Sequence, residues 1–175
     1  MPALTAASPI TAIIYSDGRQ IDTTMRSISM WLKERNHALA GFVQLNEAKP
    51  GRTRCNMILE ELASGMRVGI SEDRGPEARG CMLNMAELTR ASMLATAALE
   101  RGPDVLVINK FGKTEANGGG FRPLIAEALS RGIAILIAVP EANLPQWQLF
   151  SAGLAIDHPI AGMPSDPESA LRQLG

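Results

Sequence analysis

The 175-residue sequence is poor in aromatic residues, in cysteine and in net charge. Aromatic residues make up 4% of the chain, so the core must be built from leucine, isoleucine, valine, alanine and the nine methionines. Two cysteines cannot form a disulfide framework, which favours a reducing, cytoplasmic compartment. A net charge of −1 without a basic stripe argues against nucleic acid or a membrane surface as partner. No apolar run approaches the ~20 residues that span a bilayer, so membrane insertion is not expected.

Residues for metal binding and nucleophilic catalysis are equally scarce. Two cysteines without a neighbouring histidine are too few for a zinc site, and we predict no metal site. The two histidines, His37 and His158, have no sequence partner that would indicate a catalytic triad. Cys55 and Cys81 each follow closely after an arginine, which lowers the pKa of a nearby thiol, so both are candidate reactive thiols. The alternative is that they are simply two small, half-buried residues.

Strand and helix patterns alternate along most of the chain, as in a parallel α/β sheet. Apolar runs predict strands at 10–15, 40–45, 105–108 and 133–139, and helical periodicity predicts helices at 22–35, 121–131, 146–151 and between Asn84 and Gly102. Residues 56–71 predict a β-hairpin, although the Met, Leu and Glu residues in its first half also favour a helix. We therefore expect one domain over residues 1–175: a three-layer α/β fold with a mostly parallel sheet, a hairpin insertion at 56–71 and a flexible N-terminus at 1–9.

Polar residues that precede apolar periodicity predict the helix starts. Asp22 is the expected N-cap of the first helix. Asn84 and Glu87 form the pattern of a capping box, in which each side chain bonds the other residue's backbone N–H. Ser165 and Glu168 have the same spacing before the last helix.

The first strand–loop–helix unit is where a phosphate-binding loop would lie. Such a loop has the pattern G-x-x-x-x-G-K-[ST], whose glycines let backbone N–H groups surround the phosphates while the lysine neutralises them. With its last position on Thr23, the template places Ser16 and Ile21 at the glycines and Asp22 at the lysine. A carboxylate there would repel a triphosphate. Four residues therefore occupy phosphate-loop-like positions without the required chemistry: Asp17, Gly18, Asp22 and Thr23.

The end of the strand Val105–Ile108 is a second diagnostic position. Four consecutive aliphatic residues indicate a strand that is buried on both faces. Nucleoside triphosphatases carry an acidic residue after this strand to organise magnesium. Asn109 and Lys110 stand there instead, and a lysine opposes metal binding. The residues therefore weigh against hydrolysis.

The segment that follows this strand favours a small anion. Lys110 and Lys113 lie on the predicted strand-to-helix loop, and Arg122 lies in the first turn of the next helix, where it can serve a ligand or the Glu115 carboxylate. Three successive glycines can expose their N–H groups as an anion-binding nest: Gly118, Gly119 and Gly120. The alternative is that the charged groups are only solvated and the glycines form a flexible loop.

The segment Asn109–Arg122 resembles an uncharacterised bacterial domain family, as do the shorter segments Arg54–Met57, Leu62–Gly65 and Arg79–Asn84. The resemblance covers nearly the whole chain, from Ile10 to Leu154. Members of that family are often described as molybdenum transporter ATP-binding proteins or as nucleoside-triphosphatase-like proteins. The resemblance implies a P-loop NTPase-like topology and a link to molybdenum metabolism.

A more distant similarity connects the chain to the thermophilic nucleoside-triphosphatase family of P-loop proteins. Gly112 and Glu115 match the glycine and the later glutamate of that family's strand-end pattern. Asn109 and Lys110 replace its acidic pair, and Asp22 replaces its phosphate-loop lysine.

Together these observations predict a cytoplasmic, non-hydrolysing P-loop-like protein that binds a small oxyanion or a phosphate-bearing ligand. The predicted ligand-binding residues are Asn109, Lys110, Gly112, Lys113, Glu115, Gly118, Gly119, Gly120 and Arg122. Molybdate is the ligand that the resemblance implies, a nucleotide is the other candidate, and a second copy of the chain or a molybdenum-pathway protein is a candidate partner. Two rival hypotheses stay open: a nucleoside triphosphatase with an atypical phosphate loop, and a scaffold or regulator of molybdoenzyme assembly without a ligand.

Overall fold

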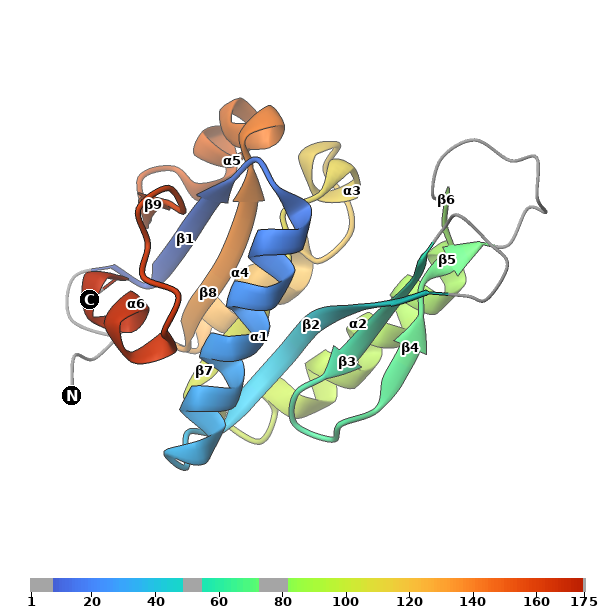
Figure 1. The fold of residues 1–175 in the computed structure, drawn as a ribbon. Coiled ribbons are helices and arrows are strands. Elements are labelled where there is room, and N and C mark those ends of the chain that lie inside the picture. The colour runs from blue at the N-terminus through green and yellow to red at the C-terminus, as the bar shows by residue number, and fades with distance from the viewer. Residues whose placement is uncertain (1–7, 49–54, 73–81, 175) are drawn as a thin grey trace.

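A seven-stranded sheet forms the centre of the computed structural model, which describes residues 8–48, 55–72 and 82–174 (Figure 1). The strand order is β4-β3-β2-β7-β8-β1-β9. Neighbouring strands run parallel from β2 to β9: β2 (Leu39–Ala48), β7 (Val105–Ile108), β8 (Ala134–Pro140), β1 (Ile10–Tyr15) and β9 (Ala155–Pro159). The antiparallel strands are β3 (Cys55–Glu61) and β4 (Arg67–Gly69), with a separate small pair β5 (Ser71–Glu72) and β6 (Met82–Leu83). The predicted α/β class with a mostly parallel sheet is confirmed.

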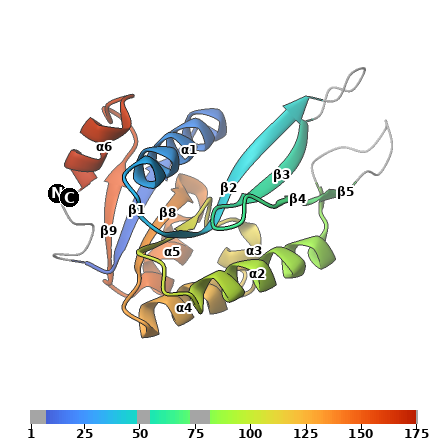
Figure 2. The ribbon, with the colours of Figure 1, turned by 90° about the horizontal axis from the view of Figure 1, so that it is seen from below.

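Helices cover both faces of the sheet and make the three layers visible in Figure 2. One face carries α1 (Gly18–Glu34) and α6 (Pro167–Leu174). The other face carries α2 (Met85–Leu99), α4 (Arg122–Ser130) and α5 (Leu144–Ser151). A single turn of helix, α3 (Lys113–Ala116), follows β7, and a 3-10 turn at Glu141–Asn143 follows β8.

The hydrophobic core consists of two clusters, one on each face of the sheet. In β7, Leu106 and Ile108 face α2 and α4, whereas Val105 and Val107 face α1, and all four are buried. Helix α1 buries residues at helical spacing: Ile21, Met25, Ile28 and Leu32. Each such side chain contributes about 1.5–3 kcal/mol when it leaves water. The prediction that Val105–Ile108 is buried on both faces is confirmed.

Strand β2 leaves the parallel sheet halfway along its length. It pairs with β7 only from Leu39 to Gly41 and with β3 from Phe42 to Ala48. Gly41 has φ +96°, and a Cβ there would lie 1.9 Å from the Val107 carbonyl oxygen. Glycine is therefore required at the point of divergence. Residues 55–69 form the hairpin predicted at 56–71, and β3 pairs with β2, so that the hairpin extends the sheet beyond β2.

Two helix caps differ from the sequence predictions, and a third lacks the second bond of its predicted capping box. Asp17, and not Asp22, caps α1, so the helix begins at Gly18. Asn84 caps α2 as predicted, but its own N–H donates to the Ile70 carbonyl, and the Glu87 carboxylate lies 3.7 Å from Arg90 Nη1. At α6 the side chain that accepts the Ser169 N–H belongs to Asp166 and not to Ser165. At α1 and α6 the aspartate that caps the helix stands beside another residue of similar N-cap propensity, so propensity alone did not select it.

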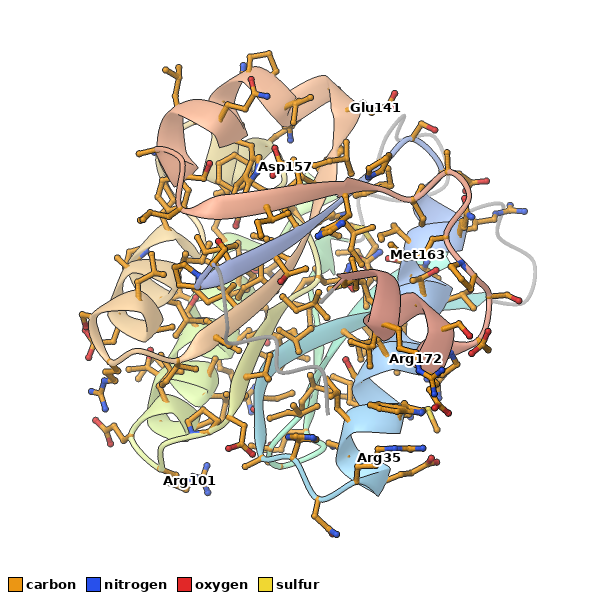
Figure 3. The ribbon with its side chains drawn as sticks, turned by 90° about the vertical axis from the view of Figure 1, so that its left-hand side faces the viewer. Arg35, Arg101, Glu141, Asp157, Met163 and Arg172 are labelled. Atoms are coloured by element: carbon orange, nitrogen blue, oxygen red, sulfur yellow. The ribbon has the colours of Figure 1, made fainter. Side chains whose placement is uncertain are left out.

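The edge strand β9 had no sequence prediction, because only a few residues of its short segment are apolar. Figure 3 views the molecule from the side on which this strand lies, with Asp157 on it. The Asp157 carboxylate accepts the indole N–H of the buried Trp147 at 2.9 Å, which attaches the strand to α5. Of the predicted flexible N-terminus, residues 1–7 lie outside the described residues, and the Pro9 carbonyl accepts the Ile135 N–H at 2.9 Å. Within the described ranges, no helix is long and apolar enough to cross a membrane.

Candidate functional site

A cavity of about 390 Å³ lies where the parallel strands β1, β7 and β8 end. In Figure 1 the arrowheads of β1 and β8 point toward this edge, near α5 and α3. Polar and charged residues from β1, β2, the segment between β7 and the end of α3, and the turn after β8 form one part of the lining: Tyr15, Gln44, Asn109, Lys110, Lys113, Thr114, Glu115 and Asn143. Apolar residues from β3, β6, α2 and the residues just before β5 and α4 form another: Met57, Leu59, Ile70, Leu83, Leu88 and Phe121. This is the edge at which open α/β sheets bind ligands.

Lys110 and Lys113 reach the same cavity, as the sequence predicted for a shared site. Lys110 is half-buried, and Lys113 is exposed at the first residue of α3. Considering only the described residues, neither ammonium group takes part in a hydrogen bond or an ion pair. The cavity therefore carries two positive charges that the described residues leave unpaired.

Phe111 fixes the loop between these two lysines. Its ring is fully buried, with the Trp147 ring 5.3 Å away and the Phe150 ring 5.5 Å away. Its N–H donates to the Ala138 carbonyl, and its carbonyl accepts the Asn143 side-chain N–H, both at 2.8 Å. The lysines thus project from an anchored backbone.

The buried Glu115 carboxylate stabilises the same loop by accepting backbone N–H groups. It is 5% exposed; Oε2 accepts the Gly112 N–H at 2.9 Å and Oε1 accepts the Phe121 N–H at 3.0 Å. Gly120, at φ +61°, leaves room for it, because a Cβ there would lie 2.0 Å from Oε1. Glu115 therefore connects the two ends of the loop and is not free to neutralise the lysines.

The triple glycine does not form the predicted anion nest. The Gly118 and Gly119 N–H groups donate to the carbonyls of Glu115 and Thr114, which are the last carbonyls of the short helix α3. Positive φ angles at Gly118 (+98°) and Gly120 (+61°) allow the chain to turn back in this way. The N–H groups of Gly118 and Gly119 are used to end α3, and the cavity lining contains none of the three glycines in the described structure.

Arg122 lies apart from the two lysines. Its guanidinium donates to the carbonyls of Glu115 and Ala116, and its central carbon lies 4.7 Å from the Phe150 ring centre. A partner for Arg122 was expected at the Glu115 carboxylate, but the contact is to that residue's backbone carbonyl. Carbonyls at a helix C-terminus attract a cation, which explains this position.

Asn109 belongs to a hydrogen-bond network that lies between β2 and β7 at the point where the two strands separate. It is 4% exposed; Oδ1 accepts the Gln44 N–H at 2.9 Å and Nδ2 donates to Asp22 Oδ1 at 3.2 Å. Asp22 Oδ2 accepts Asn46 Nδ2 at 2.8 Å, and Asn46 Oδ1 accepts Gln44 Nε2 at 3.0 Å. Asn109 thus replaces the backbone partner that β2 loses after Gly41. Sequence reasoning missed Gln44 and Asn46, although a glutamine inside the apolar run 40–45 was a signal.

The connection from β1 to α1 does not form a phosphate loop. It consists of Ser16 and Asp17, and the Asp17 carboxylate accepts the N–H groups of Arg19 at 2.8 Å and Gln20 at 3.4 Å. Gly18 is already the first helical residue, and the Thr23 hydroxyl donates to the Arg19 carbonyl. The N–H groups that would bind a phosphate are therefore occupied by a carboxylate of the chain itself.

Tyr15 ends β1 and lines the cavity, another residue that sequence reasoning missed. Burial raises the pKa of Tyr15 to about 12, and the nearby Asp22 carboxylate contributes to the shift. The phenol therefore stays neutral at physiological pH. A neutral phenol is a hydrogen-bond donor, so it is compatible with an anion in the cavity.

The side chains of the two predicted reactive thiols lie outside the part of the chain that the structure describes. Cys55 is the first residue of β3, and its side chain lies outside what the structure describes, as does the whole of Cys81. The described ranges contain no group of three or more His, Cys, Asp or Glu residues that could hold a metal ion.

Comparison with known sequences connects the chain to one family and one longer protein. The model of the family described as "Protein of unknown function (DUF2478)" matches residues 10–161. The "Molybdenum import ATP-binding protein ModC 2" of Bradyrhizobium diazoefficiens is 32% identical over 145 residues, which are 83% of this chain and 16% of that protein. The chain thus spans about a sixth of the length of this relative. These matches confirm the resemblance predicted from the sequence.

Comparison with solved structures identifies a similar fold. The crystal structure of THEP1 from the hyperthermophile Aquifex aeolicus matches with a TM-score of 0.59 and 15% identity, over 95% of each chain. At this identity the match concerns the fold alone. The predicted three-layer α/β fold with a mostly parallel sheet is thus shared with THEP1.

Proposed function

The chain belongs to the family described as Protein of unknown function (DUF2478), and on that premise we propose that it binds a small anion and does not hydrolyse nucleoside triphosphates. The anion occupies the cavity at the ends of β1, β7 and β8. Lys110 and Lys113 supply the positive charge, and the neutral Tyr15 phenol is available as a donor.

The two lysines are the observation that carries this proposal. They line one concave site, and in the described part of the chain no carboxylate pairs with either ammonium group. Like charges in a partly enclosed site repel each other, and an anion that binds between them removes this repulsion. The nearest carboxylate in the loop, that of Glu115, already accepts two backbone N–H groups.

The absence of hydrolysis is proposed from the β1–α1 connection and from Asn109. Asp17 occupies N–H groups at the start of α1 where a phosphate loop would place a phosphate. The Asn109 amide, which replaces the magnesium-organising acid, is bonded to Gln44 and Asp22. Both positions therefore serve the fold, and neither is arranged for magnesium-dependent phosphoryl transfer.

A role in molybdenum handling is supported by the name of the similar protein, which is a molybdenum import ATP-binding protein. The chain matches only 16% of that protein, so ATP binding there does not by itself assign ATP binding here. We propose molybdate as the first ligand to test, with a nucleotide as the second. Candidate partners are another copy of the chain or a molybdenum-pathway protein in the cytoplasm.

Titration calorimetry with molybdate, inorganic phosphate and ATP, each with and without magnesium, tests this proposal. We expect at least one of these anions to bind, and the double variant Lys110→Ala/Lys113→Ala to weaken binding at least tenfold. Hydrogen bonds to charged groups are worth roughly 1.5–3 kcal/mol each, which justifies this magnitude. Lys33→Ala removes an exposed lysine from the last turn of α1 and is the matched control, with unchanged affinity expected.

Other results would support a rival function. Magnesium-dependent ATP turnover that the double variant loses supports a nucleoside triphosphatase with an atypical phosphate loop. If none of these anions binds, the anion-binding proposal fails and a scaffold or regulator without a ligand becomes the better hypothesis. Equal affinity in the wild type and the double variant contradicts the lysine site.

A further inference from the structure

The side-chain oxygen of Gln44 is a buried acceptor without a donor in the described structure. Gln44 is 7% exposed and lines the same cavity as the two lysines. A buried acceptor that lacks a partner is unfavourable, and most such groups in folded proteins find a partner. This oxygen is covered by neighbouring atoms, and a ligand that displaces them from the cavity side can provide that partner.

The orientation of the Gln44 amide follows from its neighbours. The Asp22 carboxylate accepts hydrogen bonds but donates none, so Asn46 must direct its NH2 group toward it. Asn46 then presents its oxygen to Gln44, and Gln44 must present its NH2 group to Asn46. The Gln44 oxygen therefore lies on the opposite edge of its amide group, away from Asn46. Gln44 also borders a groove on the Asp22 side, but there its nitrogen faces Asn46.

The apolar part of the lining is a second, independent observation. Six side chains from β3, β6, α2 and the residues just before β5 and α4 form it: Met57, Leu59, Ile70, Leu83, Leu88 and Phe121. The volume of about 390 Å³ falls in the roughly 300–1,000 Å³ range of pockets for small organic molecules. A bare tetrahedral oxyanion on the two lysines would leave this wall uncovered and the Gln44 oxygen without a donor.

We propose that the ligand is an organic anion: a phosphate or similar oxyanion group joined to an apolar ring that carries an N–H or O–H donor. The anionic group lies at Lys110 and Lys113, the ring covers the apolar wall, and the donor reaches the Gln44 oxygen. This inference rests on the proposed function, because it uses the same lysines for the anionic group.

Four probes test this inference with the intact chain by titration calorimetry. Inorganic phosphate and molybdate present the anionic group alone, 1-naphthyl phosphate adds an apolar bicyclic ring, and 3-indoxyl phosphate adds a ring of similar size with an N–H donor. We expect 3-indoxyl phosphate to bind at least tenfold more tightly than either inorganic anion. It should also bind about three- to tenfold more tightly than 1-naphthyl phosphate, as one hydrogen bond allows.

Substitutions assign the effect to the named groups. Gln44→Leu keeps the volume and removes the acceptor, so it should abolish the preference for 3-indoxyl over 1-naphthyl phosphate. Asn46→Ala breaks the same Gln44–Asn46 bond but keeps the acceptor, and it should retain the preference. Leu83→Trp, which fills part of the apolar wall, should weaken both aryl phosphates at least tenfold, whereas Leu149→Trp at a position that is 83% exposed should not.

The outcomes separate this inference from the proposed function. One outcome overturns the inference and leaves the proposed function in place. In it, inorganic anions bind the wild type as tightly as the aryl phosphates do, and Lys110→Ala/Lys113→Ala lowers their affinity. Aryl phosphates that bind that double variant with wild-type affinity overturn the lysine site itself. Equal affinities of the wild type for the two aryl phosphates overturn the role of Gln44, even if Gln44→Leu does not fold.

Discussion

The β1–α1 connection and the β7–α3 loop lie at the same edge of the sheet, but they differ in the charge that they present to the cavity. In the first, the Asp17 carboxylate accepts backbone N–H groups at the start of a 17-residue helix. In the second, the Glu115 carboxylate accepts backbone N–H groups from the two ends of the loop, and two lysines remain unpaired among the described residues. An internal carboxylate stabilises each segment, but only the β7–α3 loop leaves positive charge facing a cavity. In the proposed function the anion therefore binds at the β7–α3 loop, and not at the β1–α1 connection where a phosphate loop would lie.

The largest expected effect comes from removing the carboxylate of the β7–α3 loop. Glu115→Ala leaves the buried N–H of Phe121 and the Gly112 N–H without acceptors, so we expect the free energy of unfolding to fall by about 3–4 kcal/mol. Urea denaturation measures this change. Glu127→Ala, which removes an exposed carboxylate paired with Arg131, is the control and should cost less than about 1 kcal/mol. Equal losses for both variants would show that Glu115 does not hold the loop.

Restoring an acid at the end of β7 tests whether Asn109 serves the fold. Asn109→Asp places a buried carboxylate beside that of Asp22, where the amide Nδ2 lies 3.2 Å from Oδ1. We expect a loss of about 2–3 kcal/mol at pH 7 that becomes smaller in acid, because protonation of the introduced carboxyl removes the repulsion. Asn46→Asp changes the other amide that bonds Asp22, but at an exposed position, and should cost less than about 1 kcal/mol. Wild-type stability of Asn109→Asp in denaturant at pH 7 contradicts this interpretation.

Tyr15 connects the two regions, and its ionisation predicts an alkaline loss of stability. Its pKa is raised to about 12 in the folded chain, from an ordinary value of 10.0. The neutral phenol therefore contributes fully below pH 10, and the contribution is lost as pH rises from about 10 to about 12. By pH 11 the loss is about 1.4 kcal/mol.

This tyrosine can be observed directly, because it is the only one in the chain. The near-ultraviolet absorbance of tyrosinate should have its midpoint near pH 12 in the folded protein and near pH 10 in urea. Tyr15→Phe should remove this loss of stability between about pH 10 and about pH 12. A native midpoint near pH 10 contradicts burial of the phenol.

The smallest expected effect concerns the cap of α1. Asp17→Ala removes the acceptor of the Arg19 and Gln20 N–H groups and should cost about 1 kcal/mol in denaturant unfolding. Asp17→Asn keeps an acceptor oxygen, so it should lower the free energy of unfolding by only a few tenths of a kcal/mol. Asp17→Ala should also leave anion affinity at the lysine cavity unchanged. A change in that affinity would contradict the separation of the two regions.

The spacing of apolar residues predicted most strands and helices, because each of these segments buries one or both of its faces in the core. The aliphatic run at 105–108 is a buried strand, and 55–69 is a hairpin. The apolar spacing did not predict segments whose structure depends on residues far away along the chain. Strand β9 has few apolar residues and is held by β1 and by the bond from Trp147 to Asp157. Asp17 was overlooked as a cap because Asp22 has the same side chain and stands nearer the apolar periodicity.

The candidate site was predicted in location but only partly in composition. Lys110 and Lys113 follow a buried strand, and strand ends of a parallel sheet meet at one edge, so their shared cavity could be anticipated. Gly118 and Gly119 instead end α3, and Arg122 bonds its last carbonyls, because a four-residue helix needs partners for its C-terminal groups. Gln44 and Tyr15 come from other strands, and nothing local connects them to the loop.

The sequence alone determined the order of the elements, the parallel sheet and the position of two cations after β7, because burial periodicity and residue charge are properties of neighbouring residues. Only the tertiary structure decided which polar groups have partners. The Glu115 carboxylate bonds two N–H groups six and three residues away, and Asn109 bonds residues 65 and 87 positions away. Hydrogen bonds act over about 3 Å, so which groups meet depends on how distant strands pack and not on their order in the chain.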